Sequence, residues 1–351
     1  MKRGNEDGVA LLLALLIVVL LTTIVVEYAY EISVEAALIA NGAEDAEAYI
    51  AAKSAVASGV GLLVADAIAA ADAGQEHVGL QDMWSYGVPN QKLNETTIRC
   101  TVTDTYGKLN LNALLGEFGN VSGQSEKQDG GQAPDTGGPA LLEAAFRALF
   151  QARGAEVDPT DAILDWMDPD DEPRPEGAES DYYASLDIPY ACKNGPMDSV
   201  DELLLIKGVT LDLFFGLPDQ EPPQRPLDEL VTVRGHPEGM INANTAPEDV
   251  LYAVCEARFP GESHRAEQAM ARRDEEPFYK LEDLEDLLRS PPPENKETPP
   301  EPEIFIVTSE VFRVQGDGMT ETSAVRIEAH VKRPAERAAE IVRVLDWRVI
   351  R

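Results

Sequence analysis

The sequence predicts an α+β protein in which a long N-terminal helix packs on a small antiparallel sheet. A large, mainly helical domain is inserted between the strands of that sheet. Two observations support this fold class. Apolar residues alternate with polar ones, as in strands, at residues 96–106 and then only from residue 304 onward, whereas the first 70 residues and the long middle region carry helical patterns. The chain, at 351 residues, is long enough for two domains.

The N-terminal helix begins in a segment suited to a membrane. Residues 9–26 carry no charge, and a helix of that length rises roughly 27 Å, close to the thickness of a bilayer core. The helix then continues, because no proline precedes Pro89 and no glycine interrupts residues 9–41. A face that packs on a globular domain is predicted at Val56, Val60, Leu63, Val64, Ala67 and Ile68. A single-pass anchor followed by a membrane-proximal helix is the alternative.

Four strands are predicted for the sheet. Residues 96–106 alternate Ile98, Cys100 and Val102 with polar side chains, as a half-buried strand does. Residues 304–314, 323–331 and 340–350 are predicted to follow as a meander. Its first turn is placed at Gly316-Asp317-Gly318, because glycine next to aspartate is typical of tight turns.

The middle region, residues 107–303, is predicted to be helical. Residues 141–153 form an amphipathic pattern, and residues 281–289 a shorter one. Capping boxes are expected at Ser199–Glu202 and at Thr245–Glu248. Residues 119–138 have the composition of a mobile loop, and the proline-rich residues 290–302 that of a tether back to the sheet.

The charge balance excludes nucleic acid as a partner. The chain has 63 acidic and 29 basic residues, a net charge of -34, whereas nucleic-acid binding needs a basic surface that replaces phosphate counterions. Helical patterns on either side of Lys207-Gly208-Val209 are similar to a helix-hairpin-helix, a DNA-binding motif. Lys207 is nevertheless outnumbered by nearby acids, so we expect this hairpin to contact protein.

The densest chemical signal is a run of acids after the segment LLDW. Eight carboxylates lie between Asp165 and Asp181, and three prolines stiffen the same stretch. Carboxylates held together repel each other unless a cation neutralises them, and flexible oxygen ligands favour Ca²⁺. The run therefore predicts a structural calcium site; a solvated acidic loop is the alternative.

Enzyme signatures are missing from the sequence. It contains no GxSxG, HExxH or Walker motif, and no Rossmann glycine pattern after a strand, so we expect a protein that is not an enzyme. The three cysteines allow one disulfide in an oxidising compartment, with Cys192–Cys255 as the candidate pair, or three free thiols; the third cysteine is Cys100.

At the N-terminus, Lys2 and Arg3 precede Gly8, the apolar run and an uninterrupted helix. This arrangement resembles the N-terminus of type IV prepilins and pseudopilins. The resemblance implies a pilin-like fold, cleavage by prepilin peptidase after Gly8, and methylation of the new N-terminus at Val9. Most members of the family have glutamate at the fifth mature position, and this chain has Leu13 there.

A large helical insertion combined with Leu13 narrows the resemblance to the K-type minor pseudopilins of the type II secretion system (the general secretion pathway protein K family). The segments GKLNLNALL, DELLLIKGVT and INANTAPEDVL occur in the family's order. The implied regions are a leader (1–8), a transmembrane part (9–30), a pilin-like helix with the first strands (31–106), the inserted α-helical domain (107–303) and C-terminal strands (304–351).

Several further expectations rest on this resemblance. The protein would cross the bacterial inner membrane once, with its soluble domain in the periplasm. With the I and J minor pseudopilins it would form the tip of the pseudopilus and help start its assembly for protein secretion. Its calcium ligands would come from the acidic segment at Asp165, Asp168, Asp170, Glu172, Glu179 and Asp181.

Leu13 has a further implication within this family. The usual glutamate pairs with the N-terminal ammonium of the neighbouring subunit already in the filament, so a subunit with leucine there would be the first in the filament. The competing function is a single-pass inner-membrane protein whose acidic periplasmic domain binds another partner. A helix-hairpin-helix protein of DNA uptake is the third, which the charge opposes.

Overall fold

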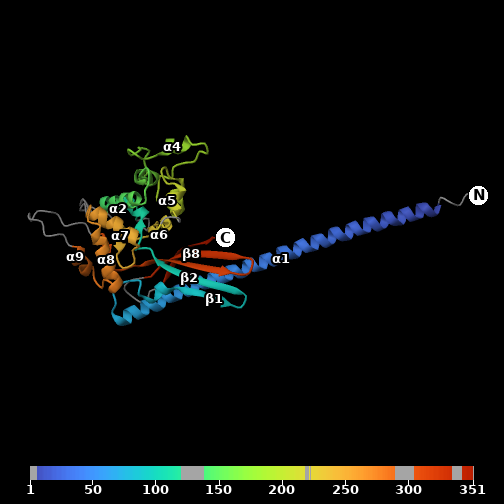
Figure 1. The fold of residues 1–351 in the computed structure, drawn as a ribbon, viewed down its shortest axis with the longest axis horizontal. Helices are drawn as coiled ribbons and strands as arrows, with labels where there is room; N and C mark the ends of the chain where they lie inside the picture. The colour runs from blue at the N-terminus through green and yellow to red at the C-terminus, as the bar shows by residue number, and fades with distance from the viewer. Residues whose placement is uncertain are drawn as a thin grey trace, which may run out of the picture.

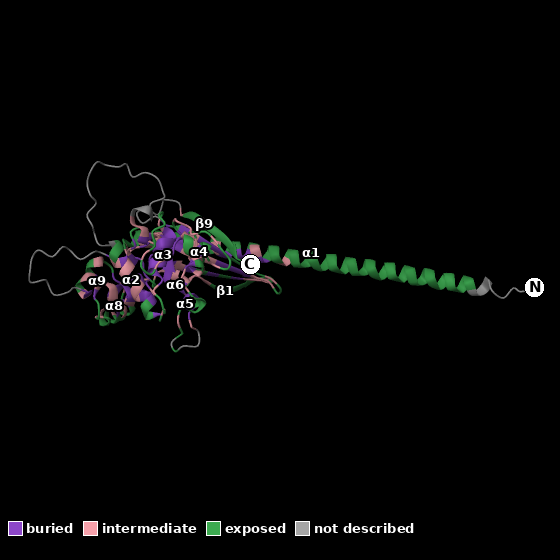
Figure 2. Ribbon diagram, turned by 90° about the horizontal axis from the view of Figure 1, so that it is seen from above, coloured by how far each residue is buried: buried purple, intermediate pink, exposed green. Residues whose placement is uncertain are grey.

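One helix of 68 residues, α1 (Glu6–Ala73), extends from the body of the protein as a rod (Figure 1). The computed structural model describes residues 6–119, 138–217, 221, 223–288, 304–333 and 342–350. The N-terminal half of α1 is exposed (Figure 2), and its most apolar 18-residue window has a mean hydropathy of 3.3 and no buried residue. Among the described helices, α1 alone is long and apolar enough to cross a membrane.

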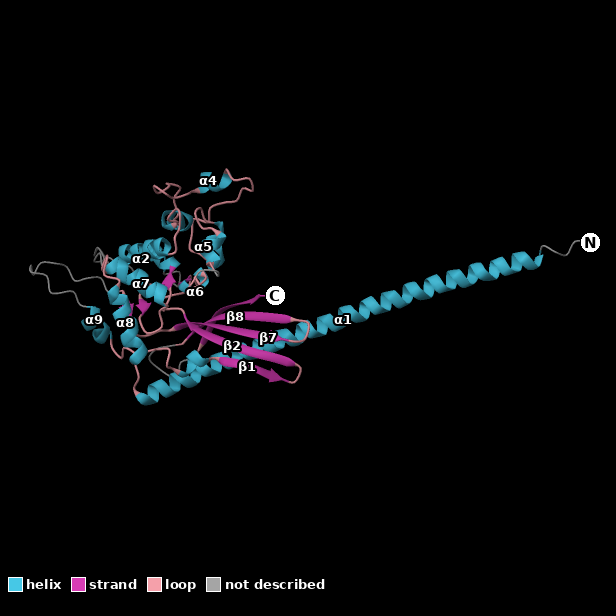
Figure 3. Cartoon of the chain, viewed as in Figure 1, coloured by secondary structure: helices cyan, strands magenta, loops and turns pink. Residues whose placement is uncertain are grey.

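The C-terminal half of α1 lies across a five-stranded antiparallel sheet (Figure 3). The strands lie side by side in the order β1 (Val88–Leu93), β2 (Thr96–Asp104), β7 (Val311–Met319), β8 (Ala324–Lys332) and β9 (Arg343–Ile350). The strand predicted at 96–106 and the final meander are confirmed. The sequence did not reveal β1, because Pro89 and the polar residues after it break the apolar alternation; proline is tolerated there because β1 is an edge strand.

The turn predicted at Gly316-Asp317-Gly318 is wrong, since these residues lie inside β7. The chain turns instead between Thr320 and Ser323, where the Thr320 amide donates to the Ser323 carbonyl over 2.8 Å. The two glycines serve helix packing: a Cβ on Gly316 would lie 2.5 Å from the Ala52 carbonyl oxygen, and one on Gly318 only 2.1 Å from that of Ala48.

The face of α1 that packs on the sheet was predicted in part. Leu63 is buried, and Val56 and Val60 pack partly buried against the same core, but Val64 and Ile68 are exposed. The contact with the sheet is made largely by small residues, namely Ala48, Ala51, Ala52, Ala55 and Gly59. Large apolar side chains mark a helix face more visibly in a sequence, whereas this helix uses alanine and glycine to approach the strands closely.

The inserted region forms a second layer around its own core (Figure 3). Four of its aromatic side chains, Phe146, Phe150, Tyr183 and Phe278, are fully buried. Its described helices are η2 (Leu111–Gly119), α2 (Gly138–Ala152), α3 (Thr160–Met167), α4 (Ser180–Ala184), η3 (Val200–Leu205), α5 (Leu211–Phe215), α6 (Leu227–Leu230), α7 (Glu248–Arg258), α8 (His264–Glu275) and α9 (Leu281–Leu288). A further short helix, η1 (Met83–Tyr86), lies outside the inserted region, between α1 and β1. Two short parallel pairs are also present. β3 (Leu109–Asn110) pairs with β4 (Val231–Thr232) within the inserted region, and β5 (Ile241–Asn242) pairs with β6 (Phe305–Ile306), which links the inserted region to the C-terminal segment.

The helices predicted at 141–153 and 281–289 correspond to α2 and α9. The capping box at Ser199–Glu202 is confirmed at the start of η3. The one predicted at Thr245–Glu248 is wrong, because Pro247 is the N-cap of α7 and the Thr245 hydroxyl instead donates to the buried Asp104 carboxylate over 2.5 Å. The loop and tether expected at 119–138 and 290–302 lie, except for residues 119 and 138, outside the described residues.

Asp104 joins the sheet to the inserted layer. It ends β2, and its carboxylate accepts hydrogen bonds from Thr245 and Asn242 of the inserted region and from Ser309 before β7. All three cysteines are free thiols, so the Cys192–Cys255 bridge does not form in this structure. The observed architecture confirms the predicted fold class, a pilin-like α+β fold with an inserted helical domain.

Candidate metal centre

Three of the predicted acidic residues converge at the end of helix α3. All eight residues of α3 are buried, so Asp165, in its last turn, directs its carboxylate into the protein. Asp168 caps the C-terminus of α3, and Glu179 is the N-cap residue of α4. One carboxylate oxygen from each of the three residues lies within 4.8 Å of the other two.

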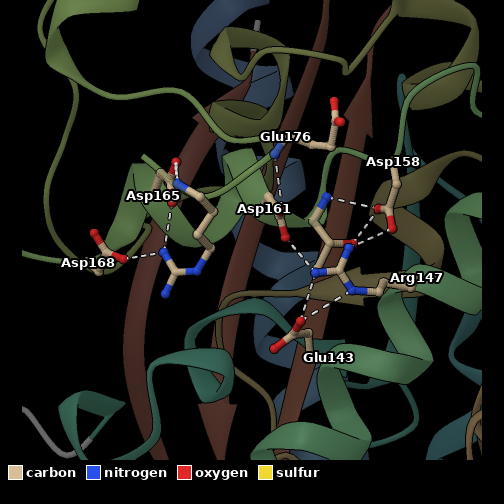
Figure 4. Close-up of polar contacts among 9 residues, drawn as sticks. Glu143, Arg147, Asp158, Asp161, Asp165, Asp168 and Glu176 are labelled. Atoms are coloured by element: carbon tan, nitrogen blue, oxygen red, sulfur yellow. Dashed lines mark hydrogen bonds and ion pairs between the residues drawn. The ribbon is translucent and has the colours of Figure 1, made fainter. Parts of the chain in front are cut away.

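Arg174 holds the loop between the two helices against the first two carboxylates. Its guanidinium Nη1 donates to Asp165 Oδ1 over 2.7 Å and also pairs with Asp168, and its backbone amide donates to Asp165 Oδ2 over 3.1 Å (Figure 4). The loop passes so close that a Cβ on Gly177 would lie 1.8 Å from Asp165 Oδ2. Only glycine fits at this position without displacing Asp165.

The third carboxylate, that of Glu179, has no donor in the part of the chain that the structure describes. Both oxygens of Glu179 and Oδ1 of Asp168 are buried without a hydrogen-bond partner among the described residues. Burial, followed by the charges of Asp165 and Asp168, raises the pKa of Glu179 to about 7. When all three carboxylates are ionised, they and the one guanidinium carry a net charge of -2, which a divalent cation with oxygen ligands would neutralise.

A second arginine anchors this loop from helix α2 (Figure 4). Arg147 donates to Asp161 of α3 over 2.5 Å, to Asp158 over 3.0 Å and to Glu143 over 2.8 Å. The other oxygen of Asp161 accepts from the backbone amide of Glu176 over 3.2 Å. The network thus connects α2, α3 and the loop, and it fixes the loop that carries Arg174.

The other three predicted ligands lie outside this group. Asp170, Glu172 and Asp181 are exposed, and Asp170 accepts from the backbone amide of Glu172 over 2.9 Å. Metal binding by any of the six acids stays a prediction. Arg174 was not singled out in the sequence, although it is the only basic residue between Asp165 and Asp181, a signal that marks it as their internal cation.

Asn194 is a further residue that sequence reasoning missed. It adopts a left-handed backbone conformation with φ of 47°, and its Nδ2 donates to the Asp170 carbonyl oxygen over 3.1 Å. Its Oδ1 is buried without a hydrogen-bond partner in the described part of the chain. No pattern in the sequence singles out this asparagine, because its role depends on how two loops meet.

The predicted processing residues are all in α1. Gly8 and Val9 lie in its first turns, 54% of Val9 is exposed, and the same fraction of Leu13 is exposed. The apolar surface of this part of the helix is therefore available to lipid or to other helices.

Comparisons with known proteins find the same kind of relative by sequence and by fold. Residues 107–217 match a family model described as type II secretion system (T2SS), protein K. Three similar proteins are named type II secretion system protein K. The one from Pectobacterium carotovorum subsp. carotovorum is 40% identical over 73 residues, which are 20% of this chain and 22% of the relative. The one from Klebsiella pneumoniae is 30% identical over 139 residues, 38% of each chain, and the one from Aeromonas hydrophila is 42% identical over 78 residues, 21% of this chain and 24% of the relative.

The alignments therefore span between 22% and 38% of the length of these relatives. The fold is similar over a greater length. A chain in the crystal structure of the GspK-GspI-GspJ complex from the enterotoxigenic Escherichia coli type 2 secretion system matches with a TM-score of 0.63 and 16% identity, covering 89% of this chain and 99% of that chain.

Proposed function

We propose that this chain belongs to the type II secretion system protein K family and is a minor pseudopilin that forms the tip of the periplasmic pseudopilus; the family model over residues 107–217 and the similar relatives support this. In this role it contributes structure and contacts to the secretion machinery, and it catalyses no reaction. Its N-terminal helix is held in the inner membrane, and the sheet with its inserted layer lies in the periplasm.

Helix α1 is the observation that carries this proposal. Its first half exposes an apolar surface along its whole circumference, while its second half is fixed to the sheet through alanine and glycine. The helix is thus apolar at one end and rigidly attached to a folded body at the other. This arrangement suits a subunit that leaves the membrane and packs beside the helices of neighbouring subunits.

Processing of the N-terminus separates this function from that of an ordinary membrane anchor. We expect prepilin peptidase to cleave the peptide bond between Gly8 and Val9 and the new N-terminus to be methylated. Mass spectrometry of the protein purified from membranes of a host that has the peptidase should therefore find an N-methylated Val9. Protein from a host without the peptidase is the control and should keep its leader; an uncut N-terminus in both hosts would support the simple anchor instead.

The partners proposed for the soluble part are the I and J minor pseudopilins. The similar solved structure is a complex of GspK with GspI and GspJ, and the fold likeness extends over nearly the whole of this chain. With these partners the chain would help start assembly of the pseudopilus, which exports folded proteins across the outer membrane.

Calcium is the cofactor proposed for the centre at Asp165, Asp168 and Glu179. The residues present fit such an ion, because both buried oxygens of Glu179 and Oδ1 of Asp168 have no donors among the described residues, and the local charge is -2 when all three carboxylates are ionised. A bound calcium ion would supply positive charge that holds the α3–α4 loop in place. Arg174 and Gly177 orient Asp165 toward the same point.

Chelation tests the calcium proposal. EDTA should lower the thermal midpoint of the full chain in detergent, and excess Ca²⁺ should restore it, since an ion bound only to the folded state stabilises that state. Glu179→Gln should remove most of the calcium-dependent shift, because it removes a buried charged ligand. The matched control Glu172→Gln changes an exposed acid of the same loop and should keep the shift; equal melting curves with EDTA and with Ca²⁺ would remove the calcium from the proposal.

A further inference from the structure

The hairpin at residues 207–209 joins η3 to α5 and packs on both helices that flank the metal centre. Gly208 has a φ of 87°, and a Cβ added there would lie 3.5 Å from the Cβ of Pro159, the N-cap residue of α3. The backbone amide of Lys207 donates to the hydroxyl of Tyr183, in α4, over 3.4 Å. The hairpin that resembles a DNA-binding motif thus contacts the chain's own α3 and α4.

The side chain of Lys207 reaches the backbone of the α3–α4 loop. Its Nζ donates to the carbonyl oxygen of Gly177 over 2.9 Å and to that of Glu176 over 3.1 Å. The same ammonium lies 5.5 Å from the centroid of the Tyr182 ring, in α4, within the range of a cation–π contact. One lysine therefore connects the hairpin both to the loop and to the helix that Glu179 caps.

The loop segment held by this lysine determines where two candidate ligands lie. Gly177 packs directly on Asp165, since a Cβ at this glycine would lie 1.8 Å from Asp165 Oδ2. Glu179 follows Gly177 by only two residues. A displacement of the segment would therefore move the Glu179 carboxylate relative to that of Asp165.

The segment is held at its amide groups and at its carbonyl groups by different residues. The Glu176 amide donates to Asp161 over 3.2 Å (Figure 4), and the Gly177 amide donates to the Arg174 carbonyl oxygen over 3.0 Å. The Glu176 and Gly177 carbonyl oxygens accept from Lys207, the one side chain among the described residues that donates to them. Loss of the lysine would thus leave this segment held at its amide groups alone.

We propose that Lys207 is a positioning residue of the metal centre, which keeps the α3–α4 loop in place while no cation is bound. This inference rests on the proposed calcium site. The ionised carboxylates of Asp165, Asp168 and Glu179 repel each other, so a loop that is not held would move Glu179 away from the other two. Where only a fraction of the molecules has the loop in place, the apparent affinity for the ion falls by that fraction. Lys207 therefore increases the calcium affinity through the loop backbone.

Calorimetric titration of the full chain in detergent with Ca²⁺ tests this role. Lys207→Met removes the donor and should weaken calcium binding at least about tenfold, as expected for loss of hydrogen bonds made by a charged group. Lys207→Arg can still donate to both carbonyl oxygens and should restore most of the affinity. Lys332→Met is the matched control, because Lys332 lies on β8 and pairs with Glu310 at 2.9 Å, and it should bind calcium as the wild type does.

Melting curves separate positioning from a purely structural contribution. A residue that only stabilises the fold would lower the thermal midpoint equally in EDTA and in excess Ca²⁺. Loss of positioning lowers it more in Ca²⁺, because a weaker site contributes less stability at the same concentration of free ion. Lys207→Gln, which is too short to reach both carbonyl oxygens, should change both measurements in the same direction, so the test does not depend on the folding of Lys207→Met.

The outcomes distinguish this inference from the calcium proposal beneath it. Calcium binding by the wild type, together with unchanged or tighter binding by the Lys207 variants, would overturn the positioning role and leave the calcium site intact. A wild type that binds no calcium would overturn both.

Discussion

At the scale of single residues, His236 makes the stability of the protein depend on pH. Its Nδ1 accepts the backbone amide of Glu238 over 3.3 Å, and its ring packs edge-on against Tyr106. Burial lowers the pKa of His236 below the value it has in the unfolded chain. As the pH falls through about 6.5, the unfolded state takes up a proton that the folded histidine does not, so folding stability declines.

Urea unfolding of the full chain in detergent, at pH 7.5 and pH 5.5, measures this effect. His236→Asn retains an acceptor for the Glu238 amide and removes the titrating ring, so the loss of unfolding free energy between the two pH values should be smaller than in the wild type. His264→Asn, at the exposed start of α8, is the control and should lose as much as the wild type. The same loss in all three proteins would show that His236 does not contribute.

Single residues also show why the candidate site was predictable only in part. The density of acids pointed to the segment in which Asp165, Asp168 and Glu179 lie together, because eight carboxylates in seventeen positions are visible in any sequence. Which of them are buried depends on α3 being enclosed on all sides and on Glu179 starting α4. Asp170 and Glu172 have the same chemistry as Asp168 and Glu179, and only the path of the loop distinguishes them.

At the scale of elements, the contact between α1 and the sheet depends on the absence of side chains in β7. Gly318→Ala would place a Cβ 2.1 Å from the Ala48 carbonyl oxygen and 2.3 Å from the Ala52 amide nitrogen. Both neighbours are helix backbone and cannot rotate away, so α1 must shift. We expect the unfolding free energy to fall by at least about 1 kcal/mol, as in overpacked cores.

Gly61→Ala is the matched control for this prediction. Gly61 lies in helix α1, and a Cβ added there would have no atom of the described residues within 4 Å. Alanine at this position should stabilise the protein by up to about 1 kcal/mol, because it favours the helix. Urea titrations of both variants measure the difference, and a Gly318→Ala protein as stable as Gly61→Ala would contradict the close packing described for β7.

The same elements show where pattern reading fails. The glycines on either side of Asp317 were interpreted as a turn. They lie inside β7 because helix α1 crosses that strand, which the sequence alone does not show. The prediction of the buried face of α1 was incomplete for a related reason: Ala48, Ala52 and Gly59 contribute little hydrophobic signal, yet they are the positions that allow close approach. Strand β2 was predicted correctly because its own side chains alternate in burial.

At the scale of the whole molecule, the fold class followed from the order of its segments. The sequence has a helix without breaks, one early strand pattern and three late ones. This order predicted that strands from both sides of a long insertion pair in one sheet, and the strand order confirms it. The junction was not predictable. Asp104, Asn242 and Ser309 are separated by up to 205 residues, and only the folded chain brings them into one buried network.

The position of the subunit in a filament is the last property that depends on the whole molecule. Leu13 lies five residues into the predicted mature chain, on the exposed apolar half of α1. A subunit at the tip has no subunit ahead of it. Glutamate at position 13 would allow this chain to pair with the N-terminal ammonium of a subunit ahead, as other members of the family do. Leu13→Glu should therefore insert into the membrane normally but lose the restriction to the tip that we propose for this subunit, and secretion should decrease.

Leu12→Glu is the matched control for Leu13→Glu. It places the same charge one position away on the same exposed, apolar part of α1, so it should not create the pairing with the ammonium of a subunit ahead. Fluorescently labelled subunits report where each variant lies in the filament, and assays of an exported enzyme report secretion. Normal secretion with Leu13→Glu still confined to the tip would show that this position does not determine the place of the subunit.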